Sequence, residues 1–436
     1  MVWTANSLRP LSLVIKNGRI LATPEPKLAS QFPVEQVIDA KGLWILPGGV
    51  DLHVHISDGA ETFFPGSCCA AAGGITTVLD MAPFHACVTQ QQLLAKSVFA
   101  RASCVVDFGL VAGIVVDNND LSHLEELAHA GAAYFKVFQP ADPPVSVETL
   151  WKAVQFAART GMRLGLHAEE TACLLPFENP LDPLSFPHSR PAVAETSAVA
   201  QLIEMASAAG APVHVCHLSC GRTADLVASG KSRGVDVTCE VAAHYLTLDE
   251  TAFSVYGALV KTTPPLRTRT DVEQLWQALS EGVIDAIACD HFTASLAPPP
   301  ADPLSVPSSA AGIAGLEVSL PLVMDAVLNG RFSLRRFVEA TAEAPAKLAG
   351  ISHEKGRLAC DMDADFVLWD PEENWTISPG GEFSRLETTP FNGWQLKGRI
   401  RQTWVRGQLV WNGKEICTPA GYGRWKKPKR AGINYD

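Results

Sequence analysis

Short runs of apolar residues alternate with amphipathic stretches through most of the chain. Strands are predicted for residues 44–55, 76–81, 105–112, 133–138, 163–167, 212–218, 235–241 and 284–290. Helices are predicted between them, for example over 121–130, 147–160, 192–209 and 271–279. Eight strand–helix units in succession predict an α/β fold of the closed parallel type, a (β/α)8 TIM-like barrel. The alternative is an open doubly wound sheet, which usually carries a glycine-rich loop after its first strand.

Both ends of the chain have a different pattern. Residues 11–21 alternate and contain Asn17-Gly18, a strong hairpin signal, and residues 400–411 form a second hairpin about Arg406-Gly407. We therefore expect the two ends to build one small β-sandwich domain. The expected division is 1–47 and 356–418 for the two parts of that domain, 48–355 for the barrel and 419–436 for a C-terminal tail. A proline-rich stretch at 298–309 is expected to be a loop over the barrel mouth.

Composition narrows the class of protein. The chain has 436 residues, of which 47% are hydrophobic and 19% charged, and no apolar run long enough to span a membrane. The 11 scattered cysteines are typical of reduced thiols in a cytoplasmic protein, and no signal peptide is apparent. A net charge of -11 argues against a nucleic-acid partner. The basic stretch 424–430 is expected to be a surface tail that packs on a neighbouring subunit or stays solvated.

Histidines gather at the predicted strand ends. His53 and His55 lie at i and i+2, so their side chains point to the same side of a strand, where neutral imidazoles suit a divalent metal. In a (β/α)8 barrel the active site lies at the C-terminal ends of the strands. The same end collects four further candidates: Lys136, His167, His217 and Asp290. A pair of buried, hydrogen-bonded histidines explains His53 and His55 alone, but not the whole set.

Lys136, and His214 close to His217, can each be read in two ways. Lys136 is flanked by Phe135 and Phe138, where a buried ammonium is costly. A neutral lysine reacts with CO₂ to give a carbamate that bridges two metal ions; the alternative is a lysine paired with a carboxylate. His214 stands three residues before His217, so strand parity predicts that it points to the opposite face and is structural.

The set His53-x-His55, Lys136, His167, His217 and Asp290 resembles the cyclic amidohydrolases of the amidohydrolase superfamily, which include dihydroorotases, hydantoinases (dihydropyrimidinases) and allantoinases. The resemblance covers nearly the whole chain. It extends to further stretches: Gly73–Thr77, Arg190-Pro191 with Glu195, His244–Leu248, Pro264–Arg267, Asp363–Asp365 and Lys397–Arg399.

The resemblance implies a binuclear centre, usually of zinc. His53, His55 and Asp290 would hold one metal, His167 and His217 the other, and N6-carboxylated Lys136 and a hydroxide would bridge them. The hydroxide would attack an amide carbonyl of a small cyclic substrate, while Asp290 passes the proton to the leaving nitrogen. It also implies homodimers or homotetramers. Candidate substrate-binding residues are His244, Thr263 and Asp58.

Which ring is opened is less constrained. Ser57 stands where dihydroorotases carry an arginine, and Ala141 where hydantoinases carry a tyrosine. The stretch Met81-Ala82-Pro83 lacks the asparagine that dihydroorotases place after Met-Pro. The surroundings of His244 and the stretch 393–399 look most like allantoinases, so allantoin is the first-guess substrate. The alternatives are a hydantoinase or another cyclic amide or imide hydrolase, and, more remotely, a non-catalytic hydantoinase-like scaffold.

Overall fold

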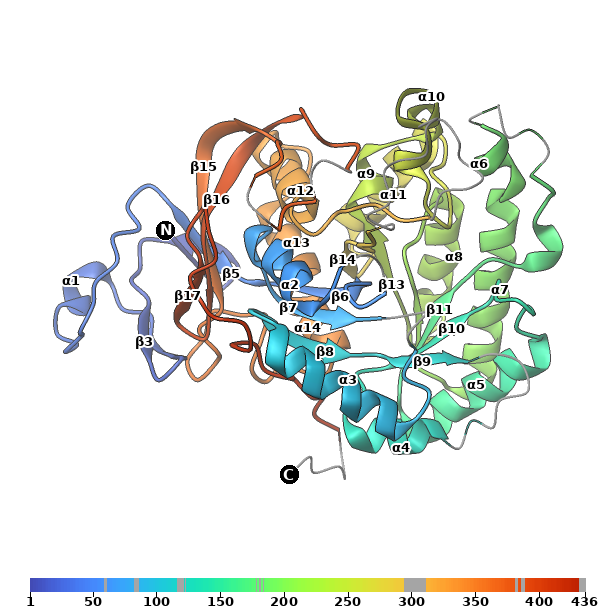
Figure 1. The fold of residues 1–436 in the computed structure, drawn as a ribbon, viewed down its shortest axis with the longest axis horizontal. Coiled ribbons are helices and arrows are strands. Elements are labelled where there is room, and N and C mark those ends of the chain that lie inside the picture. Colours follow the sequence, from blue (N-terminus) through green and yellow to red (C-terminus); the bar gives the residue numbers. More distant parts are fainter. Residues whose placement is uncertain are drawn as a thin grey trace.

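The predicted apolar strands close into a parallel barrel (Figure 1). The structure, a computed structural model, describes residues 1–58, 61–81, 86–115, 121, 123–177, 179, 182, 184–293, 311–380, 383–385 and 389–430. Its barrel strands, in order, are β6 (Gly49–Val54), β7 (Ile75–Asp80), β8 (Asp107–Leu110) continued by β9 (Ala112–Val115), β10 (Phe135–Phe138), β11 (Leu164–His167), β12 (Val213–Val215), β13 (Val237–Ala242) and β14 (Ala286–Ala288). The expected mouth loop at 298–309 lies outside the described residues.

The barrel closes between its last and first strands. The Asp290 N–H donates to the His53 carbonyl at 3.0 Å, and the His55 N–H donates to the His291 carbonyl at 2.8 Å. The residues that follow β14 therefore lie beside the end of β6. This closure places two regions more than 230 residues apart in sequence at one rim.

Helices cover the outside of the barrel, one after each strand (Figure 1). They are α2 (Phe63–Ala72), α3 (Gln90–Ser103), α4 (His123–Ala130), α5 (Val147–Thr160), α7 (Ala192–Ala209), α8 (Gly221–Ser232), α11 (Arg269–Glu281) and α12 (Ser319–Leu328). The predicted bounds of α5 and α7 agree with the structure because their ends are well marked. Ser146 caps the start of α5 by accepting from the Thr149 N–H, and Gly161 ends it with a left-handed φ of 67°.

Shorter helices occupy the loops and the floor of the barrel. The loop helices are α6 (Ser185–Ser189), α9 (Ala243–Thr247) and α10 (Phe253–Tyr256), with 3-10 turns at Thr171–Cys173, Glu250–Ala252 and Gly257–Val260. After α12 the chain continues through α13 (Leu334–Val338), a π-helical turn at Glu339–Glu343 and α14 (Ala344–Leu348). Ala346 and Ala349 pack with Val50 and Leu52 inside the barrel, so α14 closes the end opposite to the mouth.

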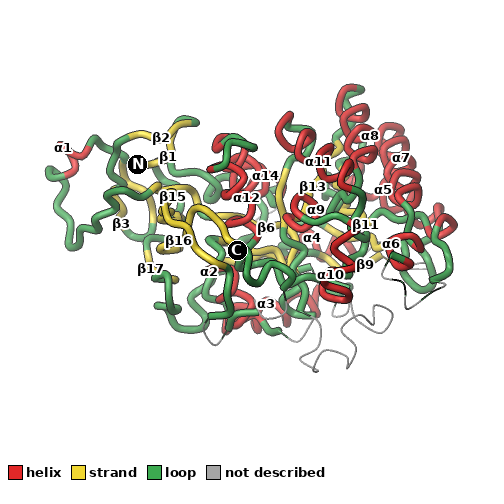
Figure 2. Tube along the Cα trace, turned by 90° about the horizontal axis from the view of Figure 1, so that it is seen from above, coloured by secondary structure: helices red, strands yellow, loops and turns green. Residues whose placement is uncertain are grey.

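Both chain ends form one small sheet beside the barrel, as predicted (Figures 1 and 2). Its order is β17 (Gln408–Trp411), β16 (Gln395–Val405), β15 (Phe366–Thr376), β5 (Trp44–Pro47), β1 (Val2–Thr4) and β2 (Ser7–Arg9). The hairpin of β3 (Val14–Lys16) and β4 (Arg19–Ala22) packs on it through Ile20, and the short helix α1 (Pro26–Ala29) follows. The single strand expected at 44–55 is two strands, since the chain passes from the small sheet to the barrel at Gly48.

The C-terminal basic stretch differs from the prediction. Its residues pack on the barrel of their own chain instead of forming a fully solvated tail, and contact with a neighbouring subunit stays a prediction. The Phe108 N–H donates to the Arg424 carbonyl, and the Lys426 N–H donates to the Phe108 carbonyl. Trp425 is only 9% exposed, with Arg101 and Lys427 over its ring. The stretch looked solvated because most of its residues are basic, but the indole ring of Trp425 is apolar and packs against the barrel.

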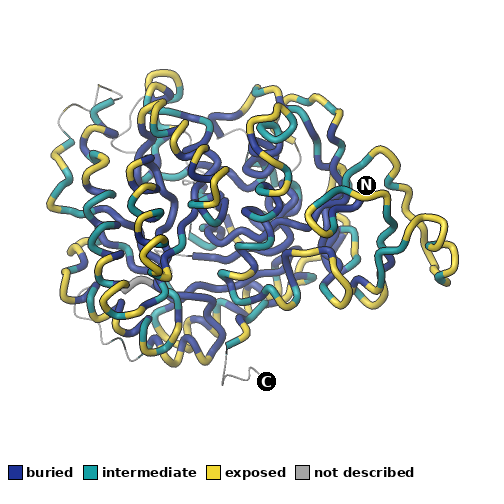
Figure 3. The backbone as a smooth tube through the Cα atoms, turned by 180° about the vertical axis from the view of Figure 1, so that it is seen from behind, coloured by how far each residue is buried: buried dark blue, intermediate teal, exposed yellow. Residues whose placement is uncertain are grey.

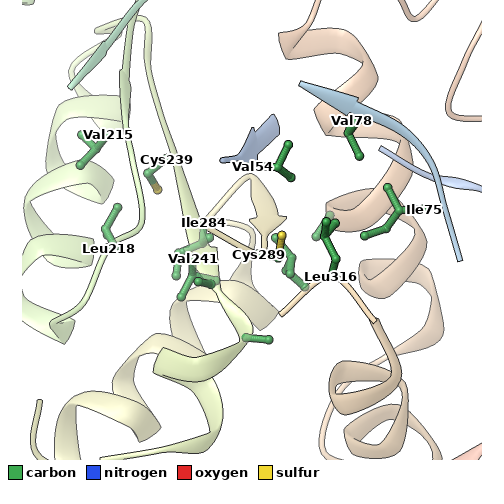
Figure 4. Close-up of a cluster of buried hydrophobic side chains, with 14 of the residues drawn as sticks. Val54, Ile75, Val78, Val215, Leu218, Cys239, Val241, Ile284, Cys289 and Leu316 are labelled. Carbon is green, nitrogen blue, oxygen red and sulfur yellow. The ribbon is translucent and has the colours of Figure 1, made fainter. Parts of the chain in front are cut away.

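The main core lies between the barrel strands and their helices. Val54, Val78, Val215 and Val241 are fully buried there, and Figure 4 shows these side chains with Leu316 and Cys289 among the strands and helices. Figure 3 shows exposed residues on the outer turns of the helices and in the loops near the N-terminus, while the barrel strands are buried. Among the described residues, no helix combines the length and the apolar character that crossing a membrane requires.

Candidate metal centre

Four imidazoles and one carboxylate converge at the C-terminal ends of the barrel strands. Asp290 Oδ1 lies 3.3 Å from the Nε2 atoms of both His53 and His55. His167 Nδ1 lies 3.1 Å from His217 Nε2, and the His53 and His217 ring centroids are 5.1 Å apart. The five side chains therefore form one continuous cluster, although they come from four different strand ends.

The spacing within this cluster fits metal ligands. Two nitrogen ligands at 2.0–2.1 Å from a tetrahedral zinc ion lie about 3.4 Å apart. The separations of 3.1–3.3 Å above are close to that value. His53, His55 and Asp290 also form a group of ligand atoms that all lie within 4.8 Å of one another. The residues present thus fit a divalent metal, with one group of three ligand atoms and one pair available.

A carboxylate lies behind three of the four imidazoles. Glu240 Oε1 lies 2.5 Å from His53 Nδ1, Asp58 Oδ2 lies 3.5 Å from His55 Nδ1, and Glu169 Oε2 lies 2.8 Å from His167 Nε2. Such partners fix which ring nitrogen is free to bind a metal. The free atoms are then Nε2 of His53 and His55 and Nδ1 of His167, the same atoms that face the cluster.

The electrostatics of the cluster call for a cation. Burial alone lowers the pKa of His55, but hydrogen bonds to Asp290 and Asp58 raise it to about 9. In contrast, burial and the nearby Lys136 charge lower the pKa of His53 to about 4. Burial, together with the same lysine and other positive neighbours, also lowers the pKa of His217. The carboxylates of Asp290 and Asp58 therefore make the surroundings of His55 negative, which favours a positive charge there.

Lys136 points into the same cluster from the middle of β10. Its side chain is buried, at 4% exposure, and its charge acts on His53, His167 and His217. It also hydrogen-bonds the thiol of Cys216. Within the described part of the chain, no carboxylate lies within ion-pair distance of its amine. The absence of such a partner distinguishes this buried lysine from an ordinary ion-paired one.

Two of the cluster residues have a left-handed backbone. His217 has a φ of 35° and Asp290 a φ of 49°, both uncommon for residues other than glycine. Both follow their strands by two residues, since β12 ends at Val215 and β14 at Ala288. The surrounding contacts hold these conformations, which cost free energy and often mark functional positions.

The left-handed backbone at His217 also explains why the predicted orientation of His214 was wrong. His214 was expected on the face opposite to His217, but both lie inside the barrel, because regular alternation stops at Val215. His214 Nε2 lies 3.2 Å from Glu240 Oε2, and its Nδ1 lies 2.9 Å from the Thr238 hydroxyl. It sits below the cluster and reaches His53 only through Glu240.

The three predicted substrate residues differ in position. His244 is buried beside Asp290, and its Nε2 has no hydrogen-bond partner in the described structure. Thr263 is half-buried in the loop after Val260, next to Thr262, whose hydroxyl lies 3.2 Å from that of Tyr245. The Asp58 carboxylate has no exposed surface and lies against His55. It therefore lies behind His55, a candidate metal-binding residue, where it can orient the imidazole ring.

The remaining histidines lie elsewhere or fall outside the description. His129, His188 and His353 are exposed, His123 is half-buried at the start of α4, and His85 lies outside the described residues. His291 is buried and contacts Glu61.

Sequence reasoning missed Glu240 and Glu169, both fully buried. A signal existed for each: Glu240 interrupts an apolar strand, and Glu169 follows His167 by two residues.

Comparisons with known proteins agree with the geometry. The model of the amidohydrolase family matches residues 44–410. A dihydroorotase from Geobacter sp. (strain M21) is 34% identical over 412 residues, which are 92% of this chain and 93% of that protein. An allantoinase from Rubrobacter xylanophilus is 35% identical over 422 residues, 90% of this chain and 89% of that one. A D-hydantoinase from Rhizobium radiobacter is 32% identical over 432 residues, 93% of each.

The solved structures give the same answer. The L-hydantoinase (dihydropyrimidinase) from Arthrobacter aurescens superimposes with a TM-score of 0.91 at 29% identity, covering 98% of both chains. The fold, the histidine-rich rim and the matched relatives lead to one conclusion: this chain belongs to the amidohydrolase family and is a hydrolase.

Proposed function

We propose that this protein is a metal-dependent cyclic amidohydrolase that opens the ring of a small cyclic amide or ureide. The observation that supports it most is the convergence of His53, His55, His167, His217 and Asp290, with ligand-atom separations of 3.1–3.3 Å, around the buried Lys136. The family match adds to this geometry.

The proposed centre holds two divalent ions, which we assign as zinc because imidazole-rich sites suit this metal. His53, His55 and Asp290 would hold one, and His167 and His217 the other. Lys136, after its amine adds CO₂ and releases a proton, would supply an anionic ligand to both. When bound, the metals supply an activated water molecule and polarise the scissile carbonyl.

Asp290 is the proposed general base and acid. Its side chain keeps 13% exposure, whereas those of His53 and His167 keep 1% and 3%. It is therefore the cluster carboxylate that reaches the mouth of the barrel. Its carboxylate would accept the proton of the attacking water and deliver it to the leaving ring nitrogen. His244, with a free Nε2 beside Asp290, would hydrogen-bond the ring.

Allantoin is the proposed first substrate, and a hydantoin or dihydropyrimidine is the second candidate. The identities of 32–35% to relatives named for different rings do not separate them. The Ser57 hydroxyl donates to Asp80 at 2.7 Å and accepts from Lys96 at 3.0 Å. Because Asp80 neutralises Lys96, this position is a poor site for a substrate carboxylate, which argues against dihydroorotate. A hydantoin is the second candidate because the solved L-hydantoinase shares the fold of this chain.

The test is a substrate panel with zinc-loaded protein. Allantoin, hydantoin, dihydrouracil, dihydroorotate and a simple cyclic imide are each followed by loss of the ring and gain of the carboxylate. Turnover of at least one ring, with about two metal ions per chain, is the expected result. A protein that binds no metal and opens no ring would instead be the scaffold alternative.

All 11 cysteines are free thiols, which supports the proposed cytoplasmic location. The proposed homodimer or homotetramer stays a prediction for light scattering.

A further inference from the structure

Glu61 is a buried carboxylate that the proposed reaction does not use. It lies just before α2, and its side chain has no exposed surface. Its Oε2 accepts a hydrogen bond from His291 Nε2 at 2.7 Å, and its Oε1 lies 3.0 Å from Arg385 Nε. Burial would raise the pKa of Glu61, but His291 and Arg385 lower it, so the group is held as an anion. A buried anion with two specific partners costs desolvation free energy and needs a reason.

The other side of the His291 ring is fixed as well. Its Nδ1 accepts from the backbone N–H groups of Gly315 at 3.0 Å and Leu316 at 3.2 Å. Because Nδ1 accepts two hydrogen bonds, the ring proton belongs on Nε2, which donates to Glu61. The ring is 1% exposed and cannot turn without breaking these bonds. Glu61 thus completes the three contacts that lock His291 in one orientation.

The backbone of His291 is part of the candidate metal centre. Its carbonyl accepts from the His55 N–H at 2.8 Å, and the residue before it is Asp290. Asp290 has a φ of 49° and is held there by its own N–H bond to the His53 carbonyl at 3.0 Å. The positions of His55 and Asp290 therefore depend on a fixed His291.

We propose that Glu61 is a positioning residue for Asp290, acting through the locked ring of His291. The role rests on the proposed function, since Asp290 matters as metal ligand and proton carrier only in that reaction. Arg385 lies between β15 and β16 of the small sheet. Its contact with Glu61 also joins that sheet to the rim of the barrel, so the small domain helps to set the geometry of the centre.

The experiment compares Glu61→Ala, Glu61→Asp and Glu61→Gln with Asp285→Ala as matched control. Asp285 precedes the same strand, β14, at its opposite end, and accepts from Lys231 Nζ and the Cys239 N–H. Zinc affinity is measured by competition with a chelator, and kcat and KM with the best ring of the panel. We expect Glu61→Ala to lose about tenfold or more in zinc affinity and in kcat with KM little changed, in line with known effects of residues that orient metal ligands.

The conservative variants separate positioning from simple stability. Glu61→Gln keeps an acceptor for His291 and should recover most of both quantities, whereas Glu61→Asp draws the carboxylate back by about 1.5 Å and should not. Asp285→Ala should lower the melting temperature but leave zinc affinity and kcat unchanged. The proposal is overturned if Glu61→Ala and Glu61→Asp bind zinc and turn over like the wild type, or if Glu61→Gln is as impaired as Glu61→Ala. A wild type that binds zinc but opens no ring contradicts the proposed reaction alone, because zinc affinity still tests Glu61.

Discussion

At the scale of single residues, the neighbours of the clustered histidines have opposite effects on their charge when no metal is bound. Asp290 and Asp58 favour positive charge at His55, while Lys136 opposes it at His53, His167 and His217. The proposed carbamate on Lys136 and the proposed cations between the ligands would remove both conflicts.

Lys136→Ala should lower bound metal from about two ions per chain to one or fewer and abolish turnover. The variant would lack the proposed carbamate, the anionic ligand that both ions would share. Elemental analysis of protein purified without chelator measures it. Lys152→Ala is the control, since Lys152 is an exposed residue of α5 that pairs only with Glu148 among its described contacts. Two bound ions and full turnover in Lys136→Ala would rule out the bridging role.

Asp290→Asn should reduce kcat by about 10²–10⁴-fold, the range usually supplied by a general base or acid. The amide keeps the shape of the side chain, so the circular-dichroism spectrum and the cooperativity of thermal unfolding should remain those of the wild type. Unchanged turnover in this variant would remove Asp290 from the proton transfer.

At the scale of secondary-structure elements, residues 424–430 form a C-terminal strap, a segment that runs along β8 and covers it. Trp425 is 9% exposed and pairs with Phe108 as an isolated bridge, and Arg430 donates to the Ala133 carbonyl at 2.6 Å. Stability should therefore depend on a segment far in sequence from the barrel strand that it covers.

Trp425→Ala should lower the free energy of unfolding by about 3 kcal/mol, as for other large-to-small changes of buried aromatic residues. Urea denaturation followed by tryptophan fluorescence and circular dichroism measures the loss. Val255→Ala is a suitable control because Val255, in α10, is 72% exposed. Equal stability of Trp425→Ala and the wild type would mean that the strap contributes nothing.

Elements were predictable where local signals agree with tertiary packing. The helices 147–160 and 192–209 match α5 and α7. Ser146 caps the start of α5, Pro191 precedes the first residue of α7, and a left-handed glycine ends each helix. The barrel strands were predictable because both faces are buried and apolar. Glu240 and the Trp425 strap were not, since a buried charge or a docked terminus depends on partners far away in sequence. His214 was misplaced because strand parity fails where the backbone turns left-handed at His217.

At the scale of the whole molecule, the barrel and the small sheet meet at a buried ionic network. Lys355 Nζ lies 2.6 Å from Asp107 Oδ2, 3.0 Å from Asp363 Oδ2 and 2.5 Å from Asp365 Oδ2. Lys426 joins it at 2.7 Å from Asp363 and 2.8 Å from Glu354. The network ties together the barrel, the small sheet and the strap.

This network makes stability sensitive to acid. Burial would raise the pKa values of Asp363 and Glu354, but Lys355 and Lys426 lower them below their ordinary values. A depressed carboxyl pKa contributes stability that is present above the ordinary pKa, near 4, and is lost as pH falls through the lowered value. The melting temperature should therefore drop as pH falls below about 4. Lys426→Met should show a smaller drop between pH 6 and 3 than the wild type, and an equal drop would contradict this account.

The order of strands in the small sheet also affects how the protein is made. β5 leaves the ribosome early, but its neighbour β15 begins about 320 residues later. At translation rates of about 5–20 residues per second, β5 must wait roughly 15 to 60 seconds for that partner. During this interval its open edge is a natural client for chaperones. Synthesis of this protein should therefore be more vulnerable to heat shock than the finished fold is.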